Sequence, residues 1–100
     1  MMKQYILQDK KPVECDDIEK WGRMMGSDTE RRVAHDEIGK IRVSTVFLGL
    51  DHRFDSAGDP ILFETLVFGG ELDGEMNRYT TWEAAELGHK AMVERVKLNQ

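Results

Sequence analysis

Apolar and polar residues alternate along several stretches of this chain in the manner of half-buried β-strands. These stretches are 3–7, 31–38, 40–50, 61–68 and the short segment 76–79, with an extended piece at 12–13. Gly39 separates the second stretch from the third, and this spacing predicts a hairpin. The pattern as a whole predicts an antiparallel sheet of four to five strands.

One helix is predicted at 17–25, where apolar residues follow the helical period of 3.6 instead. Asp16 is its predicted N-cap, because Glu19 stands three residues later as in a capping box. The apolar stripe consists of Ile18, Trp21 and Met25. The helix is too short to hold alone in water, so this stripe must pack against the rest of the protein. The segment 27–30 is predicted to be a polar loop.

A second, longer helix is predicted from Thr80 or Thr81 towards the end of the chain, with Thr80 and Glu83 spaced as a capping box. Its predicted buried stripe is Trp82, Ala85, His89, Met92 and Val96. Gly88 interrupts the helix at a cost of about 1 kcal/mol relative to alanine. Close backbone packing against the sheet is the predicted reason for this glycine.

The two central strands carry apolar residues on both faces. In 40–50, for example, Val43 and Phe47 share one face while Val46 and Leu48 share the other. A solvated antiparallel face is usually more polar than this. We therefore expect the second face to be covered by a loop or by another chain, and a homodimer through the sheet is the economical version.

The composition is that of a soluble globular protein, with 40% hydrophobic and 33% charged residues. We predict one domain, 1–100, of the α+β class, with two helices of which the longer is C-terminal. Cys15 is the only cysteine, so no intrachain disulfide can form. The N-terminus has no apolar run long enough for a signal peptide or a membrane span. These features predict a cytoplasmic protein without a membrane partner.

The charge is concentrated in one region. Between residues 61 and 89, six carboxylates and one arginine give −5, which equals the net charge of the whole chain. Basic residues are scattered, for instance Arg31 and Arg32, and this argues against direct nucleic-acid binding. The carboxylates of the glycine-rich turn, Glu71, Asp73 and Glu75, are candidates for contact with a basic partner.

A second candidate contact surface is the loop 51–60, where Asp51, Asp55 and Asp59 recur. Their spacing does not match a calcium-binding EF-hand loop. The turn with Glu71 also lacks the lysine of a phosphate-binding loop. We therefore interpret both acidic groups as solvated turns with a possible role in partner contact.

Histidine and carboxylate neighbours offer the one enzymatic alternative. His35 and Asp36 adjoin each other, as do Asp51 and His52, and together they define a possible small metal-dependent hydrolase. Closely spaced histidine pairs typical of zinc sites are missing. His89 lies on an apolar stripe, which favours a hydrogen-bonded structural histidine over a ligand. The sequence thus predicts no catalytic, cofactor or metal site with any specificity.

Three segments resemble a group of small phage and prophage proteins that have no assigned activity. They are RVSTVFLGLDHRF (42–54), LFETLVFGGELDGEMNRYTTWEAAELGH (62–89) and AMVERV (91–96). The resemblance implies expression inside a bacterial cell and carries over no catalytic residues. The predicted function is that of a non-enzymatic accessory protein that binds another protein, such as a host factor. A minor virion or assembly component is a further alternative.

Overall fold

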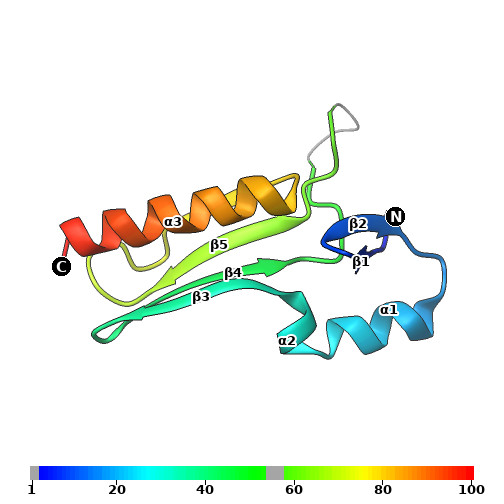
Figure 1. Ribbon diagram of the computed structural model, residues 1–100, viewed down its shortest axis with the longest axis horizontal. Helices are drawn as coiled ribbons and strands as arrows, with labels where there is room; N and C mark the ends of the chain where they lie inside the picture. Colours follow the sequence, from blue (N-terminus) through cyan, green and yellow to red (C-terminus); the bar gives the residue numbers. More distant parts are fainter. Residues whose placement is uncertain (1–2, 54–57) are drawn as a thin grey trace.

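A long helix packs along one face of an antiparallel sheet, and a small hairpin with a second helix lies at the other end of the molecule (Figure 1). The computed structural model describes residues 3–53 and 58–100. Within them the strands are β1 (Tyr5–Gln8), β2 (Lys11–Glu14), β3 (Arg32–Ile38), β4 (Ile41–Phe47), β5 (Phe63–Phe68) and β6 (Met76–Tyr79). The helices are α1 (Ile18–Met25), α2 (Asp28–Arg31) and α3 (Trp82–Leu98). This arrangement confirms the predicted α+β class with the longer helix at the C-terminus.

The main sheet is an antiparallel meander in the order β3-β4-β5-β6. Paired residues on neighbouring antiparallel strands point to the same side, so the register defines the two faces. Val43 lies opposite Val67, and Thr45 lies opposite Thr65. The fully buried residues of this face are Val43, Thr45, Phe47, Phe63, Thr65 and Val67. They are the alternate residues that the sequence pattern assigned to one side.

α3 covers this buried face with its apolar stripe. Ala85, His89, Met92 and Val96 are all buried, as predicted, whereas Trp82 is half-buried against Phe63. The N-cap is Thr81, whose side chain accepts a hydrogen bond from the Ala84 N–H at 3.0 Å. The predicted capping box from Thr80 is therefore wrong: the helix starts one residue too late for Thr80 to be its cap.

α1 packs against β1 and differs from the prediction in two details. Its N-cap is Asp17, not Asp16, because the Asp17 carboxylate accepts from the N–H groups of Glu19 and Lys20. Ile18 is 62% exposed, so it does not belong to the buried stripe; Met24 does. The side-chain stripe is rotated because the helix rests on the β1–β2 hairpin, where the Met24 sulfur lies 3.2 Å from the Leu7 nitrogen.

The prediction of a loop at 27–30 is also wrong. Asp28–Arg31 forms the single-turn helix α2, which is capped by Ser27. β4 ends at Phe47 and not at residue 50. After it, the Gly49 carbonyl accepts hydrogen bonds from the Tyr5 N–H and from the Trp21 indole. These bonds join the β1–β2 hairpin and α1 to the end of the main sheet. No helix in the described ranges is long and apolar enough to cross a membrane.

α3 does not cover the second face of the main sheet, where α2 contributes Asp28 and Arg31 to a cleft with Ser44, Val46 and Phe68. α3 is the helix that packs on β3, β4, β5 and β6, and it does so from the buried side. Phe68 and Met76 are 37% and 46% exposed on the opposite side. The expectation that a loop covers this face stays a prediction, since residues 54–57 of the loop 48–62 lie outside the described residues. Coverage by another chain stays a prediction.

Candidate functional site

The open face of the sheet carries a contiguous apolar strip, which we call the open-face strip. It consists of Val46, Leu66, Phe68 and Met76. Leu66 pairs with Met76 across β5 and β6, and it lies diagonally from Val46, which pairs with Glu64. Diagonal neighbours on one face are within reach of long side chains. The strip therefore forms one surface and not four isolated apolar residues.

Three arginines converge beside this strip at a cleft of about 230 Å³, which we call the arginine cleft. Its lining includes Arg31 from the end of α2, Arg32 and His35 from β3, and Arg42 and Ser44 from β4. Val46 and Phe68 of the open-face strip complete the wall, and Asp28 is the carboxylate that lines it.

The convergence corrects the interpretation of the basic residues as scattered. In the sequence, Arg42 stands ten positions after Arg32. The hairpin of β3 and β4 brings the two strands together, with Arg32 opposite Val46 and His35 opposite Ser44. Alternate residues of β4 then place Arg42, Ser44 and Val46 on the same face. The cluster could therefore have been predicted from the sequence only if the register of the hairpin had been known.

A buried chain of polar groups lies on the other side of the sheet. Thr65 Oγ1 is 2.5 Å from Thr45 Oγ1, Thr45 Oγ1 is 2.7 Å from His89 Nδ1, and His89 Nε2 is 2.7 Å from Asp36 Oδ2. The first three residues are buried, whereas the Asp36 side chain is 54% exposed. This confirms the prediction that His89 is a hydrogen-bonded structural histidine.

The direction of these hydrogen bonds depends on the tautomer of His89. An ionised carboxylate only accepts, so His89 Nε2–H donates to Asp36. In the neutral imidazole Nδ1 then accepts from the Thr45 hydroxyl, and Thr45 accepts from Thr65. Thr65, Thr45, His89 and Asp36 each thus have a hydrogen-bond partner within this series. A hydroxyl, an imidazole and a carboxylate in series also occur in hydrolases, but the Thr45 hydroxyl is fully buried and cannot meet a substrate.

The possible hydrolase residues His35, Asp36, Asp51 and His52 do not form such a group. His35 and Asp36 point to opposite faces of β3, since His35 pairs with Ser44 of the open face and Asp36 with the buried Val43. Within 3–53 and 58–100, no three His, Cys, Asp or Glu side chains lie close enough together to hold a metal ion. The hydrolase alternative stays a prediction without a geometric observation in its favour.

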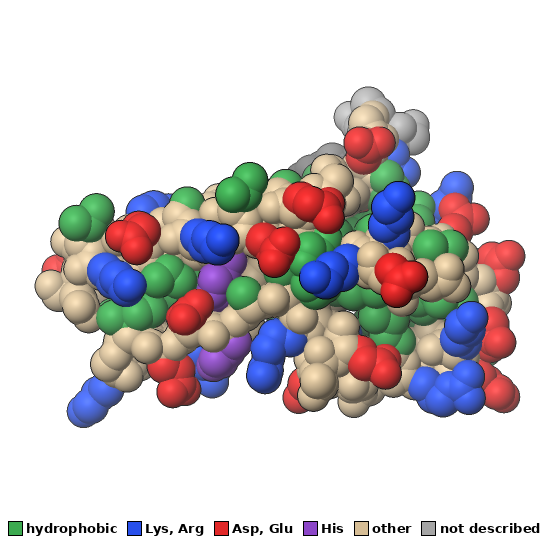
Figure 2. All heavy atoms as spheres, viewed as in Figure 1, with side chains coloured by type: hydrophobic (Ala, Val, Ile, Leu, Met, Phe, Trp, Pro, Cys, Tyr) green, Lys and Arg blue, Asp and Glu red, His purple; other side chains and the backbone are tan. Residues whose placement is uncertain are grey.

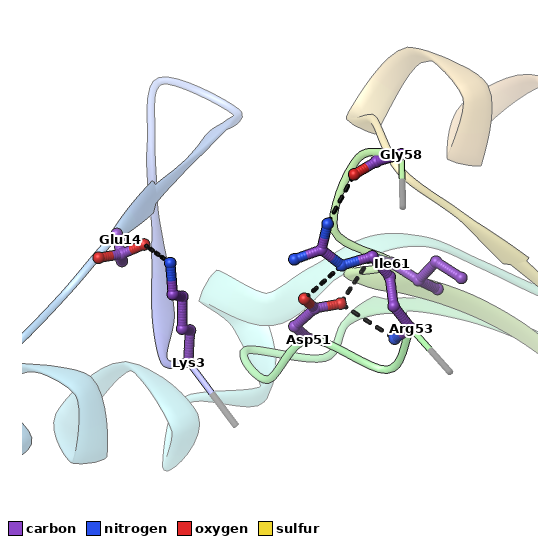
Figure 3. Close-up of polar contacts among 6 residues, drawn as sticks. All are labelled: Lys3, Glu14, Asp51, Arg53, Gly58 and Ile61. Carbon is purple, nitrogen blue, oxygen red and sulfur yellow. Dashed lines mark hydrogen bonds and ion pairs between the residues drawn. The ribbon is translucent and has the colours of Figure 1, made fainter. Parts of the chain in front are cut away.

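Asp51 ties the loop after β4 to the segment before β5 (Figure 3). Its carboxylate accepts from the Arg53 N–H at 3.0 Å, from Arg53 Nε at 2.7 Å and from the Ile61 N–H at 3.1 Å. Arg53 in turn donates to the Gly58 carbonyl at 2.6 Å. Burial raises the pKa of Asp51, but the hydrogen bonds from Arg53 and Ile61 and the charge of Arg53 lower it more. The pKa therefore lies below its ordinary value of 3.8.

We expect Asp51→Asn to lower the free energy of unfolding at neutral pH by about 1 kcal/mol, because it weakens charge-assisted hydrogen bonds. A depressed folded-state pKa gives stability that is present above the unfolded pKa and is lost as the pH falls through the folded pKa. The difference from wild type should therefore shrink in acid. Urea unfolding as a function of pH measures it, with the exposed Asp59→Asn as control. A difference that does not vary with pH would contradict this role.

The acidic turn between β5 and β6 uses two of its three candidate contact residues within the chain. Asp73 accepts a hydrogen bond from the Gly69 N–H at 2.7 Å, and Glu75 pairs with Arg95 of α3 at 2.8 Å. Gly69 and Gly70 have φ values of +94° and +73°, in agreement with the predicted turn. Glu71 is exposed and forms no such pair within the described residues.

The second acidic candidate surface is divided. Asp51 serves the loop as described above, Asp59 is exposed, and Asp55 lies outside the described residues. A role of either acidic group in partner contact stays a prediction.

Comparison with protein-family models, with curated proteins and with solved structures found no match to this chain.

Proposed function

We propose that the protein is a non-enzymatic accessory protein of a phage or prophage that acts by binding another protein, such as a host factor, through the open face of its sheet. The observation that supports this most is the open-face strip. α3 buries one side of the sheet, while Leu66 and Val46 stay half-buried and Phe68 and Met76 stay exposed on the other.

Several residues of this face are of the types that protein interfaces favour, although Glu37, Glu64 and Arg78 also lie on it by the strand register. Aromatic residues, methionine and arginine are enriched in interfaces, whereas lysine and glutamate are depleted. The open face combines Phe68 and Met76 with Arg42, whose guanidinium carbon lies 4.3 Å from the centre of the Phe68 ring. By contrast, acidic and basic side chains are interspersed along α3, as a solvated surface requires (Figure 2).

A second copy of this chain is the alternative occupant of the same face. Light scattering of the purified protein over a wide concentration range decides between the two. A mass that stays that of the monomer removes the homodimer and leaves a different protein as the partner. A dimer that Leu66→Lys dissociates would instead assign the open face to self-association.

We expect Leu66→Lys to abolish capture of the partner from a lysate of the bacterial host, because a buried lysine cannot replace leucine in an apolar contact. The matched control is Leu87→Lys on α3, which puts the same side chain at a position that is 69% exposed. Leu87→Lys should capture the partner as wild type does. Mass spectrometry of the captured proteins identifies a band that is present with wild type and Leu87→Lys and missing with Leu66→Lys.

Met76→Lys serves as the second variant, since Met76 is 46% exposed and tolerates a polar side chain in the folded protein. Circular dichroism and urea unfolding establish that each variant is folded. Equal capture by wild type, Leu66→Lys and Met76→Lys, or capture of nothing by wild type, would contradict binding through the open face.

A further inference from the structure

We infer that the arginine cleft binds carboxylates of an acidic segment in the partner protein. This inference rests on the proposed function and adds the chemical class of the partner at one end of the open face. The cleft adjoins the open-face strip through Val46 and Phe68. A single extended segment can therefore place apolar side chains on the strip and carboxylates in the cleft.

The cleft is lined mainly by basic side chains on an otherwise acidic protein. Its lining has three arginines against one carboxylate, Asp28, while the whole chain has a net charge of −5. Three other arginines pair locally: Arg53 with Asp51, Arg78 with Glu64 and Arg95 with Glu75. The cleft thus concentrates positive charge where the rest of the sequence would predict negative potential.

The cleft arginines form no ion pair within the described residues, although Glu37 lies opposite Arg42 across β3 and β4. Within the described ranges, no Asp or Glu oxygen lies within ion-pair distance of Arg31, Arg32 or Arg42. Arginine is the preferred residue for bidentate recognition of carboxylates. Three uncompensated guanidinium groups around one cleft therefore favour an external anion.

Two of the guanidinium groups are already held in position. Arg31 donates from Nε to the Phe47 carbonyl at 3.1 Å and from Nη1 to the Met25 carbonyl at 3.4 Å. Arg42 stacks on the Phe68 ring, which leaves the N–H groups at the edge of its guanidinium available. A preorganised side chain loses less conformational entropy when it binds.

The remaining polar groups of the cleft fit the same ligand. Ser44 contributes a hydroxyl, and His35, whose side chain is 28% exposed, contributes an imidazole. A long polyanion such as nucleic acid fits less well, because most of the chain's surface charge would repel its phosphates. A short acidic segment with apolar residues needs only the cleft and the strip.

The test uses hexaglutamate peptide as the probe, with inorganic phosphate at the same ionic strength as a separate arm. We expect hexaglutamate to shift the amide resonances of His35, Ser44 and Val46 saturably in NMR titration. Phosphate should bind at least about tenfold more weakly, because it cannot reach several guanidinium groups at once. Equal binding of phosphate would assign the cleft to a free anion and overturn the inference.

Arg42→Glu should weaken hexaglutamate binding by about tenfold or more, since it removes one attraction and adds a repulsion. The matched control is Lys90→Glu on the exposed side of α3, which changes the net charge equally. It should leave the affinity within about twofold. If both variants weaken hexaglutamate binding equally, the effect comes from the net charge of the protein. That result would contradict specific binding in the cleft. Arg32→Glu provides a second exposed position if Arg42→Glu does not fold.

The two proposals fail in different ways. Leu66→Lys retains all arginines, so it should bind hexaglutamate like wild type even though it loses the partner. If hexaglutamate binds saturably but no protein is captured, the inference that the cleft binds carboxylates stands and the proposed function is wrong. If Arg42→Glu still captures the partner as strongly as wild type does, the proposed function stands. The inference that the cleft binds an acidic segment of the partner is then wrong. A dimer in which the cleft is buried would assign it to a second copy instead.

Discussion

Replacing His89 with alanine is expected to lower the free energy of unfolding by about 3 kcal/mol. His89 is 3% exposed, and its imidazole bridges Thr45 of β4 and Asp36 of β3. Its removal leaves the buried Thr45 hydroxyl without this partner, which costs about 1–3 kcal/mol. It also leaves a cavity under α3, which lowers the free energy of unfolding by a further amount of similar size.

The measurement is urea unfolding of His89→Ala beside His35→Ala. His35 lies on β3, where it points to the open face and takes no part in the buried series of polar groups; its Nε2 lies 3.9 Å from Glu37 Oε1. His35→Ala should change the free energy of unfolding by less than about 0.5 kcal/mol. If both variants unfold at the same urea concentration, the buried polar chain does not hold α3 on the sheet.

Gly88→Ala is expected to lower the free energy of unfolding by about 2 kcal/mol, against the usual effect of this substitution in a helix. A Cβ at this position would overlap with the ring and hydroxyl of Tyr79 on β6. Overpacking of this kind costs about 1–3 kcal/mol and outweighs the gain in helix propensity. The structure thus confirms close packing against the sheet as the reason for this glycine.

Gly22→Ala in α1 is the matched control, since nothing lies within 4 Å of a Cβ at that position. There the higher helix propensity of alanine should act alone and raise the free energy of unfolding by up to about 1 kcal/mol. Thermal or urea unfolding of the two variants should therefore give shifts of opposite sign. Shifts of the same sign would contradict the packing of α3 on Tyr79.

The strands and the long helix of this fold could be predicted because their periodicities are unambiguous. Alternate residues of β4 and β5, such as Val43 and Phe63, are fully buried as the pattern requires. The predicted N-caps Asp16 and Thr80 are each one residue too early. The sequence does not separate them from Asp17 and Thr81, because the adjacent residues are of the same type. Only the position of the first helical N–H groups selects the second of each pair.

Tertiary contacts explain what the sequence pattern missed. α2 has four residues, which is too short for a periodic signal. β4 stops at Phe47 because the Gly49 carbonyl bonds to Tyr5 and Trp21 instead of continuing the ladder. Ile18 fits the apolar stripe of α1 by spacing, yet it is exposed because the hairpin contacts a neighbouring side of the helix.

The contact residues predicted from the sequence, such as Glu71, lie outside the open-face strip. The apolar residues on both faces of the central strands led to the expectation that a loop or another chain covers the second face, where Phe68 and Met76 are exposed. The partners of His89 could not be predicted, because Thr45 and Asp36 are 44 and 53 positions away in the sequence. The arginine cleft was missed because Arg31, Arg32 and Arg42 meet only when the register of β3 and β4 is known.

The most direct test of the central claim is methyl NMR of the protein with the partner that it captures. Binding through the open face predicts that the methyl resonances of Val46, Leu66 and Met76 shift or broaden on addition of this partner. Those of Leu87 and Leu98, which are exposed on α3, should not change. Changes confined to Leu87 and Leu98, with the open-face methyl groups unaffected, would place the interface on α3 and contradict the account.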